Sequence, residues 1–137
     1  MLVELVVDAS VAAKFYFEEE GSDRARSLLT SGEVLAAPDL LWLELASVAA
    51  KKVRLGLTEA SAALDAVGSL GDIIDEVFPA RDLARLACQF SCDDGGSVYD
   101  AVYLALARHL NVPVVTADKR LADRAEAAGA GRLVRRL

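Results

Sequence analysis

Cysteine and histidine are scarce in this chain of 137 residues, which contains two cysteines and one histidine. Cys88 and Cys92 lie four positions apart, but no second Cys/His pair accompanies them, so a zinc site is not expected. We expect two reduced, half-buried thiols, as is usual for free cysteine. His109 lies late in an apolar helical stretch, where a helix C-terminus accounts for it without a catalytic role. The sequence therefore offers no support for zinc-based or histidine-based chemistry.

Long apolar runs are also missing, although 54% of the residues are hydrophobic. Charged residues interrupt every apolar stretch, so no membrane-spanning helix is expected. The first residues, L-V-E-L-V-V-D, lack the basic stretch and cleavage site that mark a signal peptide. We therefore expect a cytoplasmic protein with no membrane partner.

Basic residues are fewer than acidic ones, 15 against 21, which gives the chain a net charge of −6. Such a chain is poorly suited to grip nucleic acid by broad phosphate neutralisation. It suits a protein whose acids gather in one cleft and are neutralised by a metal. Basic residues still cluster locally, and each cluster is either a solvated face or a contact to a polyanion. Trp42, Tyr99 and Tyr103 could stack on bases, but their helical setting favours core packing.

Alternating apolar segments and turn residues predict a single domain over residues 1–137. Short strands are expected at 3–7, 34–37, 73–78, 112–116 and, as an edge strand, 132–137. Helices are expected at 9–17, 22–31, 39–55, 58–70, 80–90, 98–110 and 119–128, with Thr58 as a cap and a loop over 91–97. Strands that alternate with helices indicate an α/β domain with a mainly parallel sheet.

Four acidic residues stand in apolar or strand-to-helix settings, where an ionised carboxylate is costly unless a cation compensates it. They are Asp8, Glu44, Asp100 and Asp118. No nearby Lys or Arg accompanies the first three. Asp8 and Asp118 follow predicted strands, and open parallel sheets bind ligands outside the carboxyl ends of their strands. If those two strands are neighbours, the acids could converge on a divalent metal.

Each acid also has a purely structural explanation. Asp8 and Asp118 could cap the helices that follow them. Ser97 and Asp100 fit a capping box, S-x-x-D. Glu44 is harder to explain in this way, because its neighbours three and four positions away are mostly apolar and include no cation. The sequence alone leaves open whether the four acids converge.

Carboxylates are the ligands that Mg²⁺ and Mn²⁺ prefer, and such ions can activate a water and stabilise the leaving oxygen of a phosphodiester. The motifs of other enzyme classes are absent: there is no P-loop, G-x-G-x-x-G, H-E-x-x-H or G-x-S-x-G. Ser10 and Thr116 each lie two positions from an acid. They could orient Asp8 and Asp118, or serve only the local helix start and strand end.

Four segments in this order resemble the PIN-domain ribonucleases, most closely the VapC-type toxins of prokaryotic toxin–antitoxin pairs. The segments are V-V-D-A-S-V, P-D-L-L-W-L-E-L-A-S-V, Y-D-A-V-Y-L-A-L-A and V-V-T-A-D-K-R-L, and the resemblance covers nearly the whole chain. It implies a three-layer α/β/α sandwich with a five-stranded sheet in the order 3-2-1-4-5. The first and fourth strands would then be neighbours.

The resemblance also implies Mg²⁺- or Mn²⁺-dependent cleavage of RNA by a metal-activated water. The implied metal-binding quartet is Asp8, Glu44, Asp100 and Asp118, supported by the polar residues Ser10 and Thr116. Family members typically form homodimers and are inhibited by an antitoxin protein that inserts a segment into the active-site groove. The basic residues expected to contact RNA are Lys14, Lys51, Lys52, Lys119 and Arg120.

Three other classes of protein also carry acids at strand ends or share this fold. A non-catalytic PIN-like module would bind RNA or a partner and hold little or no metal. A phosphorylated receiver domain would need an acceptor Asp after the third strand, where the chain has Phe78 and Pro79. A haloacid-type phosphatase would need D-x-D after the first strand, where the chain has D-A-S. We therefore predict a metal-dependent endoribonuclease that acts as the toxin of a toxin–antitoxin pair.

Overall fold

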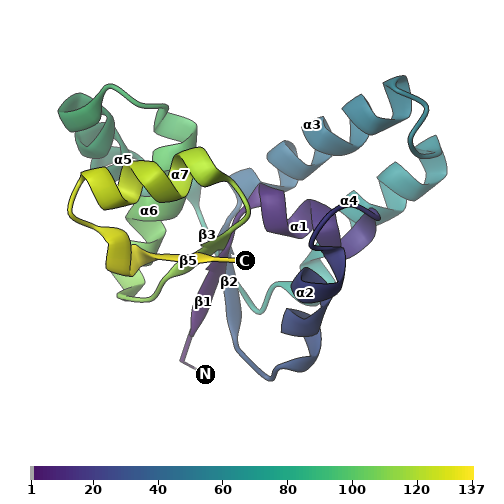
Figure 1. Cartoon of the computed structure of the whole chain (residues 1–137), viewed down its shortest axis with the longest axis horizontal. Coiled ribbons are helices and arrows are strands. Elements are labelled where there is room, and N and C mark those ends of the chain that lie inside the picture. The colour runs from purple at the N-terminus through teal and green to yellow at the C-terminus, as the bar shows by residue number, and fades with distance from the viewer. Residues whose placement is uncertain (1) are drawn as a thin grey trace.

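The computed structural model describes residues 2–137, and within them it contains one sheet of five parallel strands (Figure 1). The strands are β1 (Leu5–Val7), β2 (Leu35–Pro38), β3 (Glu76–Phe78), β4 (Val114–Thr116) and β5 (Val134–Arg136). Their order across the sheet is β3-β2-β1-β4-β5, and each neighbouring pair is parallel. The predicted order 3-2-1-4-5 is confirmed, and the sheet is wholly rather than mainly parallel.

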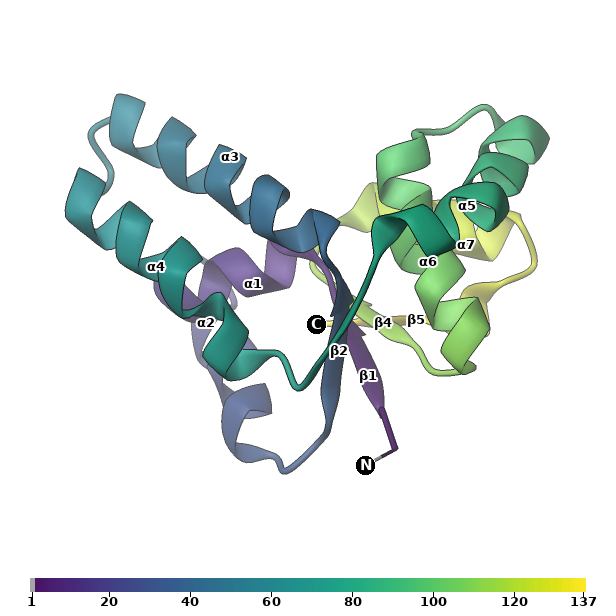
Figure 2. The same cartoon turned by 180° about the vertical axis from the view of Figure 1, so that it is seen from behind.

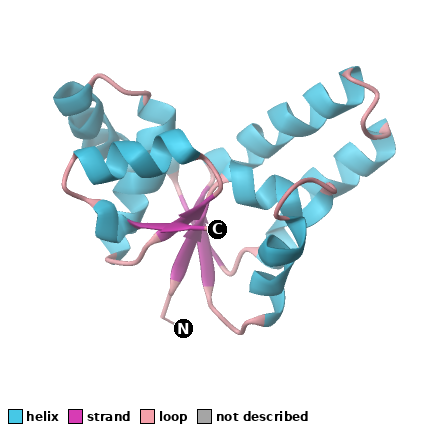
Figure 3. Ribbon diagram, viewed as in Figure 1, coloured by secondary structure: helices cyan, strands magenta, loops and turns pink. Residues whose placement is uncertain are grey.

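Helices cover both faces of this sheet (Figures 1 and 3). Within residues 2–137 they are α1 (Ala9–Tyr16), α2 (Ser22–Ser27), α3 (Leu40–Arg54), α4 (Ala60–Ile73), α5 (Ala80–Asp94), α6 (Val98–Leu110) and α7 (Lys119–Ala127). Helices α1 to α4 lie on one side and α5 to α7 on the other, which confirms the three-layer sandwich. Helices α3 and α4 form a hairpin that projects away from the sheet (Figure 2).

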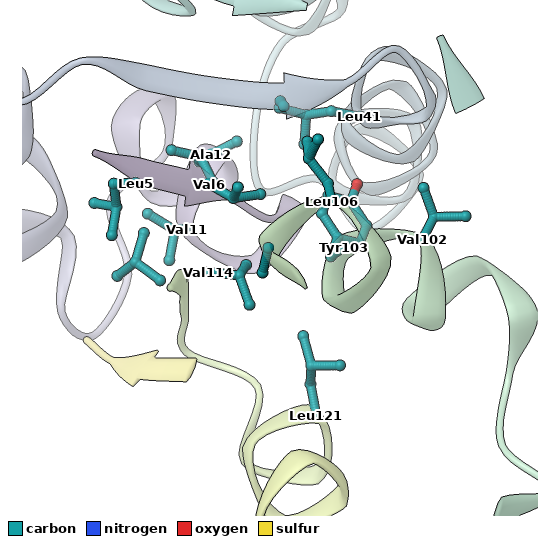
Figure 4. Close-up of a cluster of buried hydrophobic side chains, with 14 of the residues drawn as sticks. Leu5, Val6, Val11, Ala12, Leu41, Val102, Tyr103, Leu106, Val114 and Leu121 are labelled. Atoms are coloured by element: carbon teal, nitrogen blue, oxygen red, sulfur yellow. The ribbon is translucent and has the colours of Figure 1, made fainter. Parts of the chain in front are cut away.

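The core is built on the central strands, which are short runs of aliphatic residues. Leu5, Val6 and Val7 of β1 and Val114 and Val115 of β4 are completely buried. A parallel sheet with helices on both faces requires such continuous apolar strands instead of alternating ones. Figure 4 shows side chains of β1 and β4 packed with those of α1, α3 and α6. This packing fixes the carboxyl ends of β1 and β4 side by side.

The segment between α4 and β3 differs from the sequence prediction. Helix α4 continues to Ile73, so the strand that was expected to begin there begins only at Glu76. Glu59, with an extended backbone, and not Thr58, stands at the N-cap of α4. Ile73 is the last residue of α4 and Ile74 is its C-cap. The prediction placed both in a strand because a short apolar run is compatible with either a helix or a strand.

Helix α5 is longer than predicted. Its last turn, residues 91–94, occupies the first half of the segment expected to be a loop. The helix ends at Gly95, which adopts the left-handed conformation (φ 71°) that glycine tolerates without a steric penalty. The predicted helix at 22–31 also differs from the structure, where it is divided into α2 and a 3₁₀ turn at Leu28–Thr30. No helix in residues 2–137 combines the length and apolar character that a membrane crossing requires.

Candidate metal centre

Strands β1 and β4 are hydrogen-bonded neighbours, with Val6 aligned to Val114 and Val7 to Val115. Asp8 directly follows β1, Thr116 ends β4, and Asp118 lies two residues further on. The carboxyl ends of parallel strands meet at one edge of a sheet, where ligands of open α/β folds bind. The register therefore brings Asp8 and Asp118 to the same edge, as the sequence predicted.

Asp8 is a buried carboxylate, with only 4% of its surface exposed. Its Oδ1 accepts hydrogen bonds from Ser10 Oγ at 2.7 Å and from the Val11 backbone N–H at 3.1 Å, and its Oδ2 accepts one from Thr116 Oγ1 at 2.5 Å. The bond from Val11 makes Asp8 the N-cap of α1. No Lys or Arg in the described part of the chain forms an ion pair with it. Asp8 is thus held in place by hydrogen-bond donors but is not neutralised.

The pKa of Asp8 is raised to about 6, mainly by burial. The hydrogen bonds from Ser10, Thr116 and Val11 lower it, and the negative charge of Asp118 raises it further. Burial outweighs the hydrogen bonds because a carboxylate removed from water loses its hydration. Asp8 is therefore a buried carboxylate with a raised pKa beside a second carboxylate, Asp118. A bound cation would stabilise the ionised form of Asp8.

Ser10 and Thr116 connect the two strand ends through their hydroxyl groups. Besides donating to Asp8, Ser10 Oγ accepts the Ala117 N–H at 2.9 Å, and Thr116 Oγ1 accepts the Asp118 N–H at 2.9 Å. Asp118 in turn caps α7, because its Oδ1 accepts the Arg120 N–H at 2.9 Å. Both functions left open by the sequence are therefore present: these hydroxyls serve local backbone and also fix the Asp8 carboxylate.

Glu44 reaches the same region from α3, on the opposite side of the sheet from α6. The Tyr103 hydroxyl of α6 donates a 2.5 Å hydrogen bond to Glu44 Oε1. Burial raises the pKa of Glu44, and so do the charges of Asp100 and Asp8, while the bond from Tyr103 lowers it. Tyr103 itself is buried, and its pKa is raised by burial and by the charge of Glu44. Glu44 is therefore anchored by a neutral donor and surrounded by like charge.

For Tyr103 the sequence favoured core packing over stacking on bases, so its contact with Glu44 was missed. The available signal was its position three residues after Asp100 on one helix, because residues at this spacing share a face. The prediction of core packing is right for its ring, which is 2% exposed. It is wrong for Tyr99, which is 67% exposed.

Asp100 lies in the first turn of α6, half-buried. Its backbone N–H donates to Ser97 Oγ at 3.3 Å, which is one half of the predicted capping box. Within residues 2–137 its carboxylate does not return a hydrogen bond to Ser97, so the box is incomplete. The charge of Asp100 instead raises the pKa of Glu44. Capping therefore accounts for the backbone of Asp100 but not for its carboxylate.

The carboxylates at this edge act on one another electrostatically: Asp118 on Asp8, and both Asp8 and Asp100 on Glu44. No three His, Cys, Asp or Glu side chains in residues 2–137 stand close enough to form a ready-made metal cage. The donor set is that of a hard divalent cation, which binds a few carboxylates and completes its coordination with water and phosphate oxygens. The arrangement is an open acidic site and not a closed structural one.

A pocket of about 570 Å³ lies beside this site, and Thr116 and Asp118 form part of its wall. Four cationic side chains also line the pocket. The cations are Lys14, Arg24, Lys119 and Arg136. Arg24 and Arg136 were not among the expected RNA contacts, because they are far from the acids in sequence and only the fold brings them near. Lys119 and Arg120 are strongly exposed, at 82% and 91% of their side chains.

Four of the five expected RNA contacts form an ion pair with an acid, and two of these four are also largely buried. Lys14 and Lys52 form ion pairs with Glu19 at 3.0 and 2.9 Å, and their side chains are only 12% and 17% exposed. Lys51, by contrast, is exposed. Burial raises the pKa of Glu19, but the hydrogen bonds and charges of the two lysines outweigh it and lower the net pKa. Their ammonium groups are therefore less available to a polyanion than those of Lys51, which is exposed, and Lys119, whose ion pair with Asp123 is open to solvent.

The two cysteines and the histidine lie on α5 and in the last turn of α6. Cys88 and Cys92 are free and exposed on α5, so the prediction of half-buried thiols is wrong. Both fall on the solvent face of a helix whose opposite face packs on α6. His109 occupies the last turn of α6, as predicted, and its ring meets Phe78 edge-on at 6.4 Å between centroids.

The fold and this acidic edge define a class of protein. The chain belongs to the PIN domain family, whose family model matches residues 5–127. It is 31% identical over 124 residues to Ribonuclease VapC3 of Pyrobaculum aerophilum, an alignment that covers 89% of this chain and 95% of that protein.

Solved structures agree on the fold. The crystal structure of PAE2754 from Pyrobaculum aerophilum superposes with a TM-score of 0.67 at 24% identity and covers 90% of this chain and 81% of that one. The crystal structure of VapC20 from Mycobacterium tuberculosis, a sarcin-ricin loop cleaving toxin, gives a TM-score of 0.67 at 19% identity, with 92% and 95% covered. At these identities the likeness concerns the fold, which is that of PIN and VapC structures.

Proposed function

We propose that this protein is a Mg²⁺- or Mn²⁺-dependent endoribonuclease and the toxin component of a toxin–antitoxin pair. Membership of the PIN domain family and the similarity to Ribonuclease VapC3 support a ribonuclease. The single observation that carries the proposal is the buried Asp8, whose pKa burial raises to about 6 although three hydrogen bonds oppose the shift. Such a carboxylate, without a cationic partner in residues 2–137 and beside other acids, suits a bound metal ion.

The residues proposed to hold the metal are Asp8, Glu44, Asp100 and Asp118. When bound, Mg²⁺ or Mn²⁺ would supply Lewis acidity and lower the pKa of a water that attacks the phosphodiester. The protein's own contribution is orientation. Ser10 and Thr116 fix the Asp8 carboxylate from two sides, and Tyr103 fixes Oε1 of Glu44. Asp100 and Asp118 are half-buried and therefore remain accessible to a substrate at the edge of the sheet.

RNA is proposed to approach through the cationic pocket beside Asp118. Lys119 and Arg120 are exposed at the start of α7, and Arg24 extends the positive charge along the pocket. Arg136 also lines the pocket, but it forms ion pairs with Asp123 and Glu126. Arg24 has no ion pair with an acid anywhere in residues 2–137, which leaves its guanidinium free for a phosphate. Local charge would then bind the RNA backbone although the whole chain is acidic.

Partner proteins are proposed to use two adjoining surfaces that share Leu55 and Leu57. A groove of about 390 Å³ beside Ser10 is lined by Lys51, Leu55 and Leu57, among others. Its mixed apolar and basic lining suits an inserted segment of the antitoxin. The α3–α4 hairpin exposes Leu43, Leu55, Leu57 and Leu64, each more than 60% accessible. Exposed leucines on a projecting hairpin support the proposed homodimer.

The test is cleavage of mixed cellular RNA by purified protein freed of any co-purifying partner. Wild type should cut RNA with Mg²⁺ or Mn²⁺ and lose the activity in EDTA. Asp100→Asn should abolish cleavage, whereas Asp65→Asn, which alters an exposed acid on α4, should retain it. Equal cleavage by wild type and Asp100→Asn would exclude the proposed site.

A non-catalytic PIN-like module that binds RNA or a partner is the second candidate. The observation in its favour is that no ready-made group of three ligands exists in residues 2–137. It requires weak or no metal binding. Binding of RNA without metal-dependent cleavage, together with an absence of Mn²⁺ binding, would favour this module over the nuclease.

A further inference from the structure

The solvent face of α5 carries a pair of thiols, on a helix that supplies none of the four proposed metal ligands. Cys88 and Cys92 lie one helical turn apart, and their Sγ atoms are 4.0 Å from each other. Both are exposed and neither is in a disulfide. The opposite face of the helix is anchored by the buried Leu83, Ala87 and Phe90. The two thiols are therefore held in position by a packed helix and are open to solvent.

This geometry is unfavourable for a disulfide. Residues four apart on a helix have Cβ atoms about 5–6 Å apart, whereas a disulfide needs a Cβ separation of about 3.8 Å. Oxidation would therefore have to unwind α5. A single metal ion has no such requirement: with metal–sulfur bonds of about 2.3 Å it reaches sulfurs up to about 4.6 Å apart. The observed 4.0 Å lies within that span.

Charge also favours a cation at this pair. The hydrogen bond with Cys88 and the charge of that thiol raise the pKa of Cys92, and the nearby Asp93 adds to the effect. A bound cation would replace both thiol protons and remove the repulsion between two thiolates. Asp94 is not available as a ligand, because Arg124 binds both of its carboxylate oxygens.

The number of ligands limits the kind of ion. No third Cys, His, Asp or Glu in residues 2–137 completes a group of three with these thiols. Zinc in structural sites takes four protein ligands, and Mg²⁺ prefers oxygen. Thiolates select soft ions, and Cu⁺ is the soft ion that two sulfurs can satisfy.

We propose that Cys88 and Cys92 form a two-thiolate site for a soft, low-coordinate metal ion of the Cu⁺ class. On binding, each S–H gives its proton to solvent and each sulfur forms one bond to the ion. The oxidation states of copper and sulfur do not change. The site takes a soft ion, whereas the carboxylate edge takes a hard one, so it is independent of the proposed nuclease activity.

The test is an anaerobic titration of the full chain with Cu⁺ in competition with a coloured Cu⁺ chelator. Wild type should bind one ion per chain. Cys88→Ser and Cys92→Ser should each weaken binding by more than about a hundredfold, because even groups that only orient a metal ligand contribute 10–100-fold. Circular dichroism should show both variants folded, since both positions are exposed.

A spacing control separates a chelating pair from two reactive thiols. The double variant Cys92→Ser with Gln89→Cys keeps two exposed thiols on α5, but at adjacent positions that do not face each other. It should bind Cu⁺ as weakly as the single variants. Binding by this variant as tight as wild type, or one ion shared by two chains, would overturn the proposal.

Discussion

At the scale of single residues, Asp8 is a carboxylate that the fold removes almost completely from water. Burial raises its pKa from 3.8 to about 6, so the folded protein binds the proton more tightly than the unfolded chain. The stability that follows is complete below the unfolded pKa and is lost as the pH rises through the folded pKa. A shift of this size corresponds to about 3 kcal/mol. In the absence of metal, folding should therefore be penalised at neutral pH.

Asp8→Asn tests this penalty because the variant carries no charge at any pH. Its free energy of unfolding relative to wild type should increase between pH 4 and pH 7 in metal-free buffer. The increase should approach about 3 kcal/mol, less what the amide loses in hydrogen bonding. Urea denaturation of both proteins across this range measures the difference. Parallel pH profiles for wild type and variant would contradict the account.

The hydrogen bond from Tyr103 to Glu44 can be tested by a single substitution. Tyr103→Phe removes the donor to Glu44 Oε1 without changing the packed ring. RNA cleavage should fall by about 10–100-fold, as for other groups that orient metal ligands. Stability should fall by only about 1 kcal/mol, the worth of one hydrogen bond. Tyr99→Phe is the matched control, since Tyr99 is exposed, and a similar loss of activity in both variants would exclude a positioning role.

At the scale of elements, the N-terminus of α6 depends on a contact with α7. Arg124 donates to Asp94 at the end of α5 and to the Ser97 carbonyl at 2.8 Å, so it ties the loop before Asp100 to two helices. These bonds hold the pKa of Asp94 below its usual range. Gly96 lies directly against the guanidinium, and a Cβ there would collide with it. The glycine is needed for close approach, not for an unusual backbone angle.

Gly96→Ala should therefore displace Arg124 and move the start of α6. We expect a loss of about 1–3 kcal/mol, because a charged hydrogen-bonding group loses its partners, and lower RNA cleavage because Asp100 shifts. Gly68→Ala is the control: nothing lies within 4 Å of its added Cβ in α4, so it should stabilise by about 0.5–1 kcal/mol. Thermal unfolding of both variants gives the comparison. Unchanged stability in Gly96→Ala would show that Arg124 is not fixed.

The sequence could predict the type and order of the elements but not all of their ends. Strands β1 and β4 were identifiable because buried parallel strands read as short aliphatic runs before a capping acid. The last turn of α5 was missed because its polar residues resemble a loop, and only Gly95 ends it. Tyr103 and Arg24 were missed for a different reason: their contacts depend on packing between distant segments, which no local pattern records.

At the scale of the whole molecule, the α3–α4 hairpin packs on α1 through part of its length, and its far end extends beyond the rest of the fold (Figure 2). Its exposed leucines include Leu57, between the two helices, and Leu64 on α4. If the protein is a homodimer through this hairpin, Leu57→Glu with Leu64→Glu should convert it to a monomer, because burying a charge at an apolar interface is costly. Light scattering after gel filtration measures the mass. Leu29→Glu, at an exposed leucine in the 3₁₀ turn, should leave the dimer intact.

Four carboxylates, two from helices (Glu44 and Asp100) and two that follow strands (Asp8 and Asp118), are proposed to act as one metal site. Calorimetric titration with Mn²⁺ tests this proposal without an RNA substrate or a partner. Wild type should show saturable binding that is lost in Glu44→Gln and retained in Glu59→Gln, which alters an exposed acid outside the site. Binding that is equal in wild type and Glu44→Gln, or absent from wild type, would contradict the account.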